Sequence, residues 1–201
     1  MTQKHFAISL GAILFGALVY STASFTELAA MLAPVIVHEL GHIVMLRLCG
    51  LPIRRFSADL GGFCIEYGGI ASPLEHCACA FAGPAAGLAY AFAASYFAAR
   101  SGNEVLTLSA GVSFLLSVFN LLPVLPLDGG RIFSAAMTGL LGSRRGDAVT
   151  KGVGLALSTA LLFAGTWLMW RGDGTALMLA SLWLLIAQPD RAVLVNRREV
   201  L

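Results

Sequence analysis

Charged residues are scarce in this chain of 201 residues, and long apolar segments take their place. Only 12% of the residues are charged and 58% are hydrophobic, with a mean hydropathy of +0.81. Soluble domains average about 25% charged and about 45–50% apolar residues. The composition therefore excludes an ordinary soluble domain and predicts an integral membrane protein.

Several signatures of other protein classes are also missing. The sequence has no low-complexity tract, no repeat of solenoid length and no soluble appendage. The basic residues are spread over short loops and form no patch, so nothing predicts a nucleic-acid partner. Cys77 and Cys79 lack the C-x₂₋₄-C spacing of structural zinc sites, and we expect these two residues, with Cys49 and Cys64, to be small buried thiols.

The apolar segments predict an all-α polytopic membrane protein. A spanning helix takes about 20 largely apolar residues. By that measure about six transmembrane helices are expected, over residues 6–23, 28–48, 74–99, 105–122, 149–170 and 174–190. Ser21 and Ala23 have the spacing of a signal-peptide cleavage site, but the apolar run before them is long for a signal core.

The distribution of basic residues predicts the orientation. With a cytoplasmic N-terminus, eleven of the thirteen lysines and arginines fall on the cytoplasmic side, and only Arg100 and Arg171 fall on the far side. Such an excess is the positive-inside signal. We expect a multi-pass protein of the cell membrane with both termini in the cytoplasm.

The second predicted span contains "HELGH", residues 38 to 42. His38 and His42 are four residues apart, so on a helix they lie on one face, where both can reach one metal ion. Glu39 points to the side of that face, within reach of a metal-bound water. This is the H-E-x-x-H arrangement of zinc hydrolases, in which the glutamate is the general base.

A third ligand is needed, because catalytic zinc usually has three protein ligands. The strongest candidate is Asp128, in "FNLLPVLPLDGGRIF", residues 119 to 133. Pro123 and Pro126 cannot continue a helix, and Gly129 and Gly130 are expected to allow a tight backbone turn. Because the second and fourth spans run in the same direction, Asp128 and the histidines are expected at similar depth, in the cytoplasmic half of the bilayer.

These two motifs together resemble those of the site-2 protease family of intramembrane zinc metalloproteases. The resemblance covers about residues 28–141. Within the family, the chain looks most similar to the short bacterial subgroup related to the sporulation enzyme that processes a pro-sigma factor. It implies one Zn²⁺ held by His38, His42 and Asp128, with Glu39 as general base. It also implies that Asn120 positions the substrate or stabilises the oxyanion.

The resemblance extends to "FAGPAAGL", residues 81 to 88, with a departure from the family pattern. The family often has an asparagine three residues after the proline, where this chain has Gly87. We therefore assign no catalytic role to this helix. Gly83 and Gly87 are expected to serve the close packing of helices.

Residues 53–70 are too short and too rich in glycine to span the membrane. Two β-like runs flank "DLGG", which predicts a small membrane-associated β-hairpin. One edge of it could accept an extended substrate segment by strand addition.

The expected protein is thus a single membrane protease domain over 1–201, without a PDZ or nucleotide-sensing domain. Its expected partners are a membrane-tethered protein substrate, the lipid bilayer and a separate regulatory membrane protein. The expected activity is regulated intramembrane proteolysis, such as release of a pro-sigma or transcription factor. Two alternatives stay open: an ion or metal transporter that uses the intramembrane His/Glu/Asp cluster, and an inactive protease relative.

Overall fold

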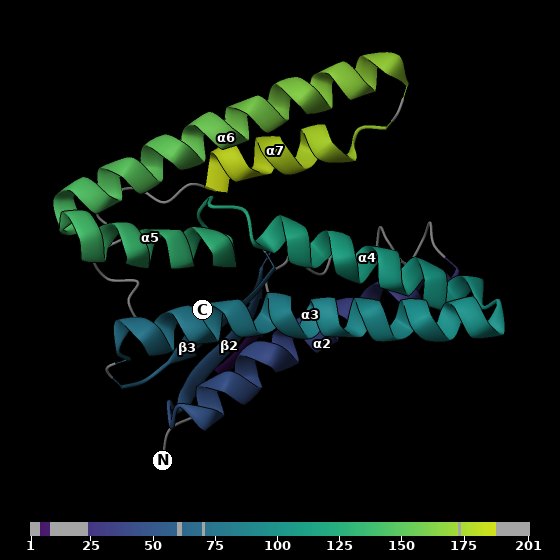
Figure 1. Ribbon diagram of the computed structural model, residues 1–201, viewed down its shortest axis with the longest axis horizontal. Helices are drawn as coiled ribbons and strands as arrows, with labels where there is room; N and C mark the ends of the chain where they lie inside the picture. Colours follow the sequence, from purple (N-terminus) through teal and green to yellow (C-terminus); the bar gives the residue numbers. More distant parts are fainter. Residues whose placement is uncertain (1–4, 9–23, 60–61, 70, 173, 188–201) are drawn as a thin grey trace. The chain divides into compact units, whose positions relative to one another are not determined.

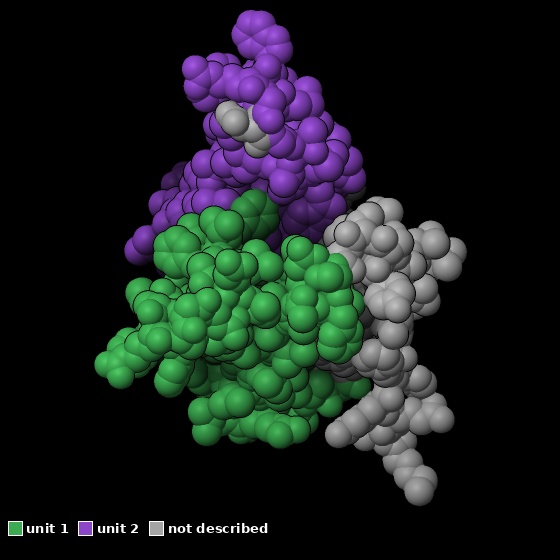
Figure 2. Space-filling view, turned by 90° about the vertical axis from the view of Figure 1, so that its right-hand side faces the viewer, with its two compact units in different colours: residues 1–120, 198–201 green, residues 121–197 purple. Residues whose placement is uncertain are grey.

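The computed structural model describes residues 5–8, 24–59, 62–69, 71–172 and 174–187. The chain divides into two compact units, residues 1–120 with 198–201 and residues 121–197, which are coloured separately in Figure 2. The described residues are mostly helical, with one small sheet.

The first unit contains three packed helices, α2 (Phe25–Leu48), α3 (Pro73–Ser101) and α4 (Glu104–Asn120), shown in Figure 1. Helices α2 and α3 each begin with a capping box. In α3 the Ser72 N–H donates to the Glu75 carboxylate at 2.7 Å and the Glu75 N–H donates to the Ser72 hydroxyl at 3.3 Å. Two otherwise unpaired backbone donors are thereby satisfied, which fixes where the helix starts.

Small residues bring these helices together, as expected for Gly83 and Gly87. On α4, Ser109, Ser113 and Ser117 are all buried. The Ser113 hydroxyl donates to the Gly87 carbonyl at 2.8 Å. Association in lipid depends on such close contacts and interhelical hydrogen bonds, because lipid tails are as apolar as the helices.

A three-stranded sheet, in the order β1-β2-β3, also belongs to the first unit. The strands β2 (Ile53–Asp59) and β3 (Gly62–Tyr67) are antiparallel and lie in the stretch where the hairpin is predicted. The strand β1 (His5–Ile8) pairs in parallel with β2. The predicted span over 6–23 is therefore wrong at its start, because residues 6–8 pair as a strand; residues 9–23 lie outside the described residues.

The second unit contains α5 (Asp128–Leu141), α6 (Ser143–Arg171) and α7 (Ala176–Ala187), with α6 packed against both others. The sequence patterns did not indicate α5, which is amphipathic and too short to span. Gly142, between α5 and α6, has φ 77°, a left-handed value that favours glycine.

Three helices in the described part of the chain are long and apolar enough to cross a membrane: α2, α3 and α6. They coincide with the predicted spans at 28–48, 74–99 and 149–170, which are therefore confirmed as long apolar helices. Helix α4 has 17 residues and α7 has 12, which correspond to about 26 Å and 18 Å at 1.5 Å per residue, against a hydrocarbon core of about 30 Å. The structure thus supports a mostly helical membrane protein.

Gly129 and Gly130 serve a different purpose from the one predicted. Neither has a positive φ, and both lie in the first turn of α5. Their surroundings explain the glycines, because a Cβ on Gly129 would lie 2.1 Å from the Leu121 carbonyl oxygen and a Cβ on Gly130 would lie 2.4 Å from the Val124 carbonyl carbon. The loop before α5 folds back against the helix, and only glycine leaves room for its backbone.

We therefore predict that Gly130→Ala destabilises the protein by about 1–3 kcal/mol, the usual cost of overpacking. Gly139→Ala on the same helix is the matched control, because its Cβ would meet nothing within 4 Å. That control should be neutral or slightly stabilising, since alanine is the better helix former. Thermal unfolding in detergent measures both, and equal melting temperatures for the two variants would contradict the packing argument.

Candidate metal centre

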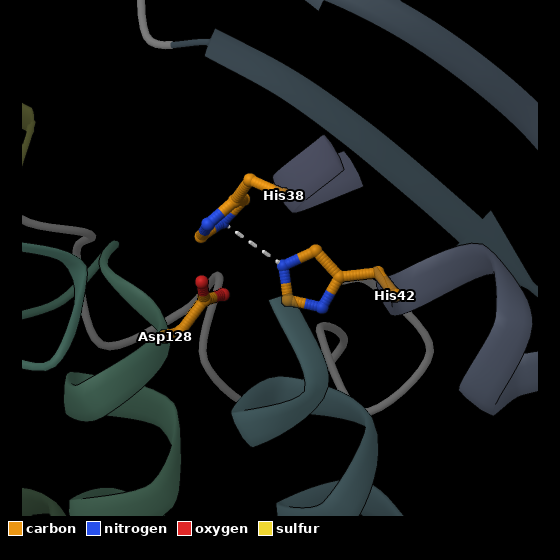
Figure 3. A group of neighbouring side chains, drawn as sticks. All are labelled: His38, His42 and Asp128. Carbon is orange, nitrogen blue, oxygen red and sulfur yellow. Dashed lines mark hydrogen bonds between the residues drawn. The ribbon is translucent and has the colours of Figure 1, made fainter. Parts of the chain in front are cut away.

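Two histidines on α2 form the centre of the candidate site. His38 and His42 are 5% and 4% exposed, and their Nε2 atoms lie 3.2 Å apart (Figure 3). Two imidazole nitrogens bound to one tetrahedral zinc at about 2.0–2.1 Å would lie about 3.3 Å apart. The spacing of the two rings therefore fits a shared zinc ion.

The hydrogen-bond partner of its second ring nitrogen shows where His42 carries a proton. His42 Nδ1 lies 2.7 Å from the carbonyl oxygen of Cys79 on α3. A carbonyl oxygen can only accept a hydrogen bond, so Nδ1 carries the proton and donates it. In the neutral ring Nε2 then carries no proton, and its lone pair, which here lies against Nε2 of His38, is the one that a metal ligand would use.

Helix α3 also leaves space for the His42 ring. A Cβ on Gly83 would lie 2.2 Å from Nε2 of His42 and 2.5 Å from its Cε1. Any side chain at this position would occupy the volume of the imidazole. Gly83 therefore faces a candidate ligand, which the small-residue spacing in the sequence did not reveal.

Asp128 is the first residue of α5, after the N-cap residue Leu127. Its residue exposure is 6%. The Arg131 guanidinium lies 3.7 Å from its carboxylate, one turn along the helix. Both the cation and the helix N-terminus stabilise a negative charge, so Asp128 is placed to act as an anionic ligand.

His38, His42 and Asp128 form a group that could hold a metal ion. Each offers one ligand atom, and these atoms all lie within 4.8 Å of one another (Figure 3). Two imidazoles and one carboxylate are donors that zinc accepts, and three protein ligands leave a fourth position for water or substrate. The donor set thus fits a catalytic zinc ion.

The other two predicted site residues are half-buried. Glu39 follows His38 on α2. Asn120 is the last residue of α4, where its Nδ2 donates to the Leu116 carbonyl at 3.0 Å. Their placement is compatible with the predicted roles but does not test them.

Sequence reasoning missed three supporting groups: the Cys79 carbonyl, Gly83 and Arg131. The i,i+3 spacing of Asp128 and Arg131 was a usable signal, since such pairs face each other on a helix. The sequence held no comparable signal for the other two groups, because their role depends on how α2 and α3 pack.

Three of the cysteines, those whose side chains the structure describes, are free thiols. Cys79 is buried, whereas Cys49 and Cys77 are half-buried. The expectation of small buried thiols is therefore confirmed for Cys79, and the side chain of Cys64 lies outside the described set.

Comparison with known proteins relates the chain to metalloproteases. The family model "Peptidase family M50" matches residues 96–164. The "Putative zinc metalloprotease Rip3" of Mycobacterium tuberculosis is 38% identical over 135 residues, which cover 63% of this chain and 33% of that protein. The "Putative zinc metalloprotease sll0528" of Synechocystis sp. is 25% identical over 169 residues, which cover 78% of this chain and 42% of that protein.

A solved structure shares the fold. The site-2 protease from Methanocaldococcus jannaschii matches with a TM-score of 0.68 at 22% identity, over 89% of this chain and 84% of that one. The chain spans about a third of the Rip3 relative and about two fifths of the Synechocystis relative. Together the matches confirm the resemblance to the site-2 protease family and support a metalloprotease.

We predict that the purified chain binds about one zinc per molecule and that His38→Ala or Asp128→Ala lowers this content sharply. Each substitution removes one of three protein ligands. Metal analysis after extensive dialysis measures the zinc content. Asp147→Ala is the control, because Asp147 lies on α6 outside the group, and an equal loss of zinc in that variant would argue against the assigned ligands.

Proposed function

We propose that this relative of the site-2 proteases is an intramembrane zinc metalloprotease. It hydrolyses a peptide bond within or near a transmembrane segment of a membrane-tethered protein. The observation that carries the proposal is the pair of buried imidazoles, with Nε2 atoms 3.2 Å apart, on a helix long enough to cross a membrane. Polar groups at membrane depth are costly and therefore indicate function.

In this proposal His38, His42 and Asp128 hold one zinc ion per chain. When bound there, zinc supplies the activation of water and the polarisation of the scissile carbonyl. The chain's own contribution is to keep the ligands in place. The Cys79 carbonyl orients His42, and the Arg131 guanidinium lies beside the Asp128 carboxylate.

Glu39 is the general base. It takes a proton from the attacking water and passes it to the leaving amine, which is the role of the glutamate in H-E-x-x-H hydrolases. Because it follows His38 directly on α2, it lies beside the metal face without competing for the same position. Asn120, at the end of α4, positions the substrate or stabilises the oxyanion.

The substrate must present an extended peptide bond, because a helix hides its carbonyls in hydrogen bonds. The strand β3 offers a means to do this, since it is an outer strand of the described sheet. An extended segment can add to such an edge through main-chain hydrogen bonds. We propose that the membrane-associated β2–β3 pair holds the unwound substrate in this way.

The excess of basic residues in the proposed cytoplasmic loops supports cytoplasmic termini. His38 and His42 lie in the later half of α2, which then ends on the cytoplasmic side. The active site accordingly lies in the cytoplasmic half of the bilayer. This placement suits regulated intramembrane proteolysis that releases a pro-sigma or transcription factor, with access controlled by a separate membrane protein.

Glu39→Gln should abolish cleavage of a single-span, membrane-tethered substrate while zinc stays bound. Loss of a general base costs about 10²- to 10⁴-fold in rate, and glutamine keeps the size of the side chain. Glu104→Gln, at the exposed start of α4, is the matched control and should cleave normally. Cleavage by the wild type should also stop when a chelator removes the metal and return with zinc.

Full activity of Glu39→Gln would overturn the protease mechanism. Zinc or ion flux through the wild type in vesicles, without cleavage, would instead support the transporter alternative. Zinc binding with neither cleavage nor flux would support an inactive relative.

Strand addition makes a separate prediction about the β3 edge. A photo-crosslinking amino acid in place of Phe63 should capture the substrate near its cleaved bond, because the strand and the substrate then run side by side. The same replacement at Phe163, exposed on α6, should not capture that segment. Mass spectrometry of the crosslinked peptides identifies the contact, and capture from position 163 alone would refute strand addition.

A further inference from the structure

Helix α3 touches His42 at two points that lie one helical turn apart. The Cys79 carbonyl accepts the Nδ1 proton of His42 at 2.7 Å. Four residues later, Gly83 leaves the space that the imidazole occupies, since a Cβ there would lie 2.2 Å from Nε2 and 2.8 Å from Cδ2. Residues four apart share a helix face, so the carbonyl and the glycine act on the same ring.

The ring has little freedom to move away from an added methyl group. His42 is 4% exposed, and its hydrogen bond to Cys79 fixes the ring relative to α3. The contact at 2.2 Å involves Nε2, the nitrogen that faces His38. A methyl group at position 83 would therefore either break the hydrogen bond or turn Nε2 away from His38.

Gly87, one turn further along α3, provides a comparison. A Cβ there would lie 2.2 Å from the Ser117 hydroxyl oxygen, at the end of a side chain on α4. Both glycines are thus equally crowded, but only Gly83 is crowded by a candidate metal ligand. Small-residue packing alone accounts for Gly87, whereas Gly83 also determines where a ligand lies.

We infer that Gly83 is a positioning residue for the metal ligand His42, and that α3 thereby sets the ligand geometry without contributing a ligand. The inference rests on the proposed zinc site and deepens it. It also gives the helix with the Gly-Pro element a role in the site, which the sequence alone did not indicate.

The test uses the full chain in detergent with Gly83→Ala and with Gly87→Ala as the matched packing control. Zinc affinity is measured by competition with a chelator. Displacing a group that orients a ligand typically costs 10- to 100-fold in metal affinity, and we expect a loss of this size for Gly83→Ala only. Co²⁺ serves as a second probe, because its visible spectrum reports a change in ligand geometry.

A second measurement examines whether Gly83 acts through His42. The melting temperature of the metal-free protein is compared for Gly83→Ala in the wild type and in a His42→Ala background. Residues in contact are not additive in such a cycle. We expect a lower melting temperature in the wild type and no penalty once the imidazole is gone. If Gly83→Ala alone fails to fold, recovery of folding in the double variant has the same meaning.

Wild-type zinc affinity in Gly83→Ala, or the same thermal penalty in both backgrounds, would overturn the inference while leaving the proposed function intact. Failure of the wild type to bind zinc would instead refute the proposed function. In that case the metal-free thermal cycle still decides whether Gly83 positions His42.

Discussion

The hydrogen bond from His42 to the Cys79 carbonyl connects the fold of the first unit to the chemistry of the site. It is 2.7 Å long, and because its acceptor carries no proton it determines which ring nitrogen of His42 can serve as a metal ligand. The bond can form only where α2 and α3 approach closely. Gly41 permits that approach, since a Cβ on it would lie 2.5 Å from the Ala82 carbonyl oxygen.

The cost of polar groups in lipid explains why the buried histidines and Asp128 are surrounded by partners from the protein. A histidine or carboxylate at membrane depth needs partners inside the protein, because lipid offers none. His38 and His42 face each other, and Asp128 lies beside Arg131 at a helix N-terminus. A metal ion that joins two imidazoles and a carboxylate would add a further partner for these groups, whose burial is costly.

The sequence predicted the parts of the fold that depend on local pattern. Helical spacing placed His38 and His42 on one face, and hydropathy located α2, α3 and α6. It did not predict α5, which is too short and amphipathic to resemble a span. The sequence also misled about Gly129 and Gly130. It does not show whether a glycine is needed for a positive φ or for close contact with a neighbouring backbone segment. What Gly83 faces was hidden for the same reason, since it depends on the packing of α2 against α3.

X-ray absorption spectroscopy at the zinc edge of the purified chain tests the central claim most directly. The account predicts zinc with two imidazole nitrogens and oxygen ligands at about 2.0–2.2 Å and no sulfur. A spectrum with sulfur at about 2.3 Å would place the metal on cysteines instead, and a chain that purifies without zinc and cannot be loaded with it would contradict the metal site altogether.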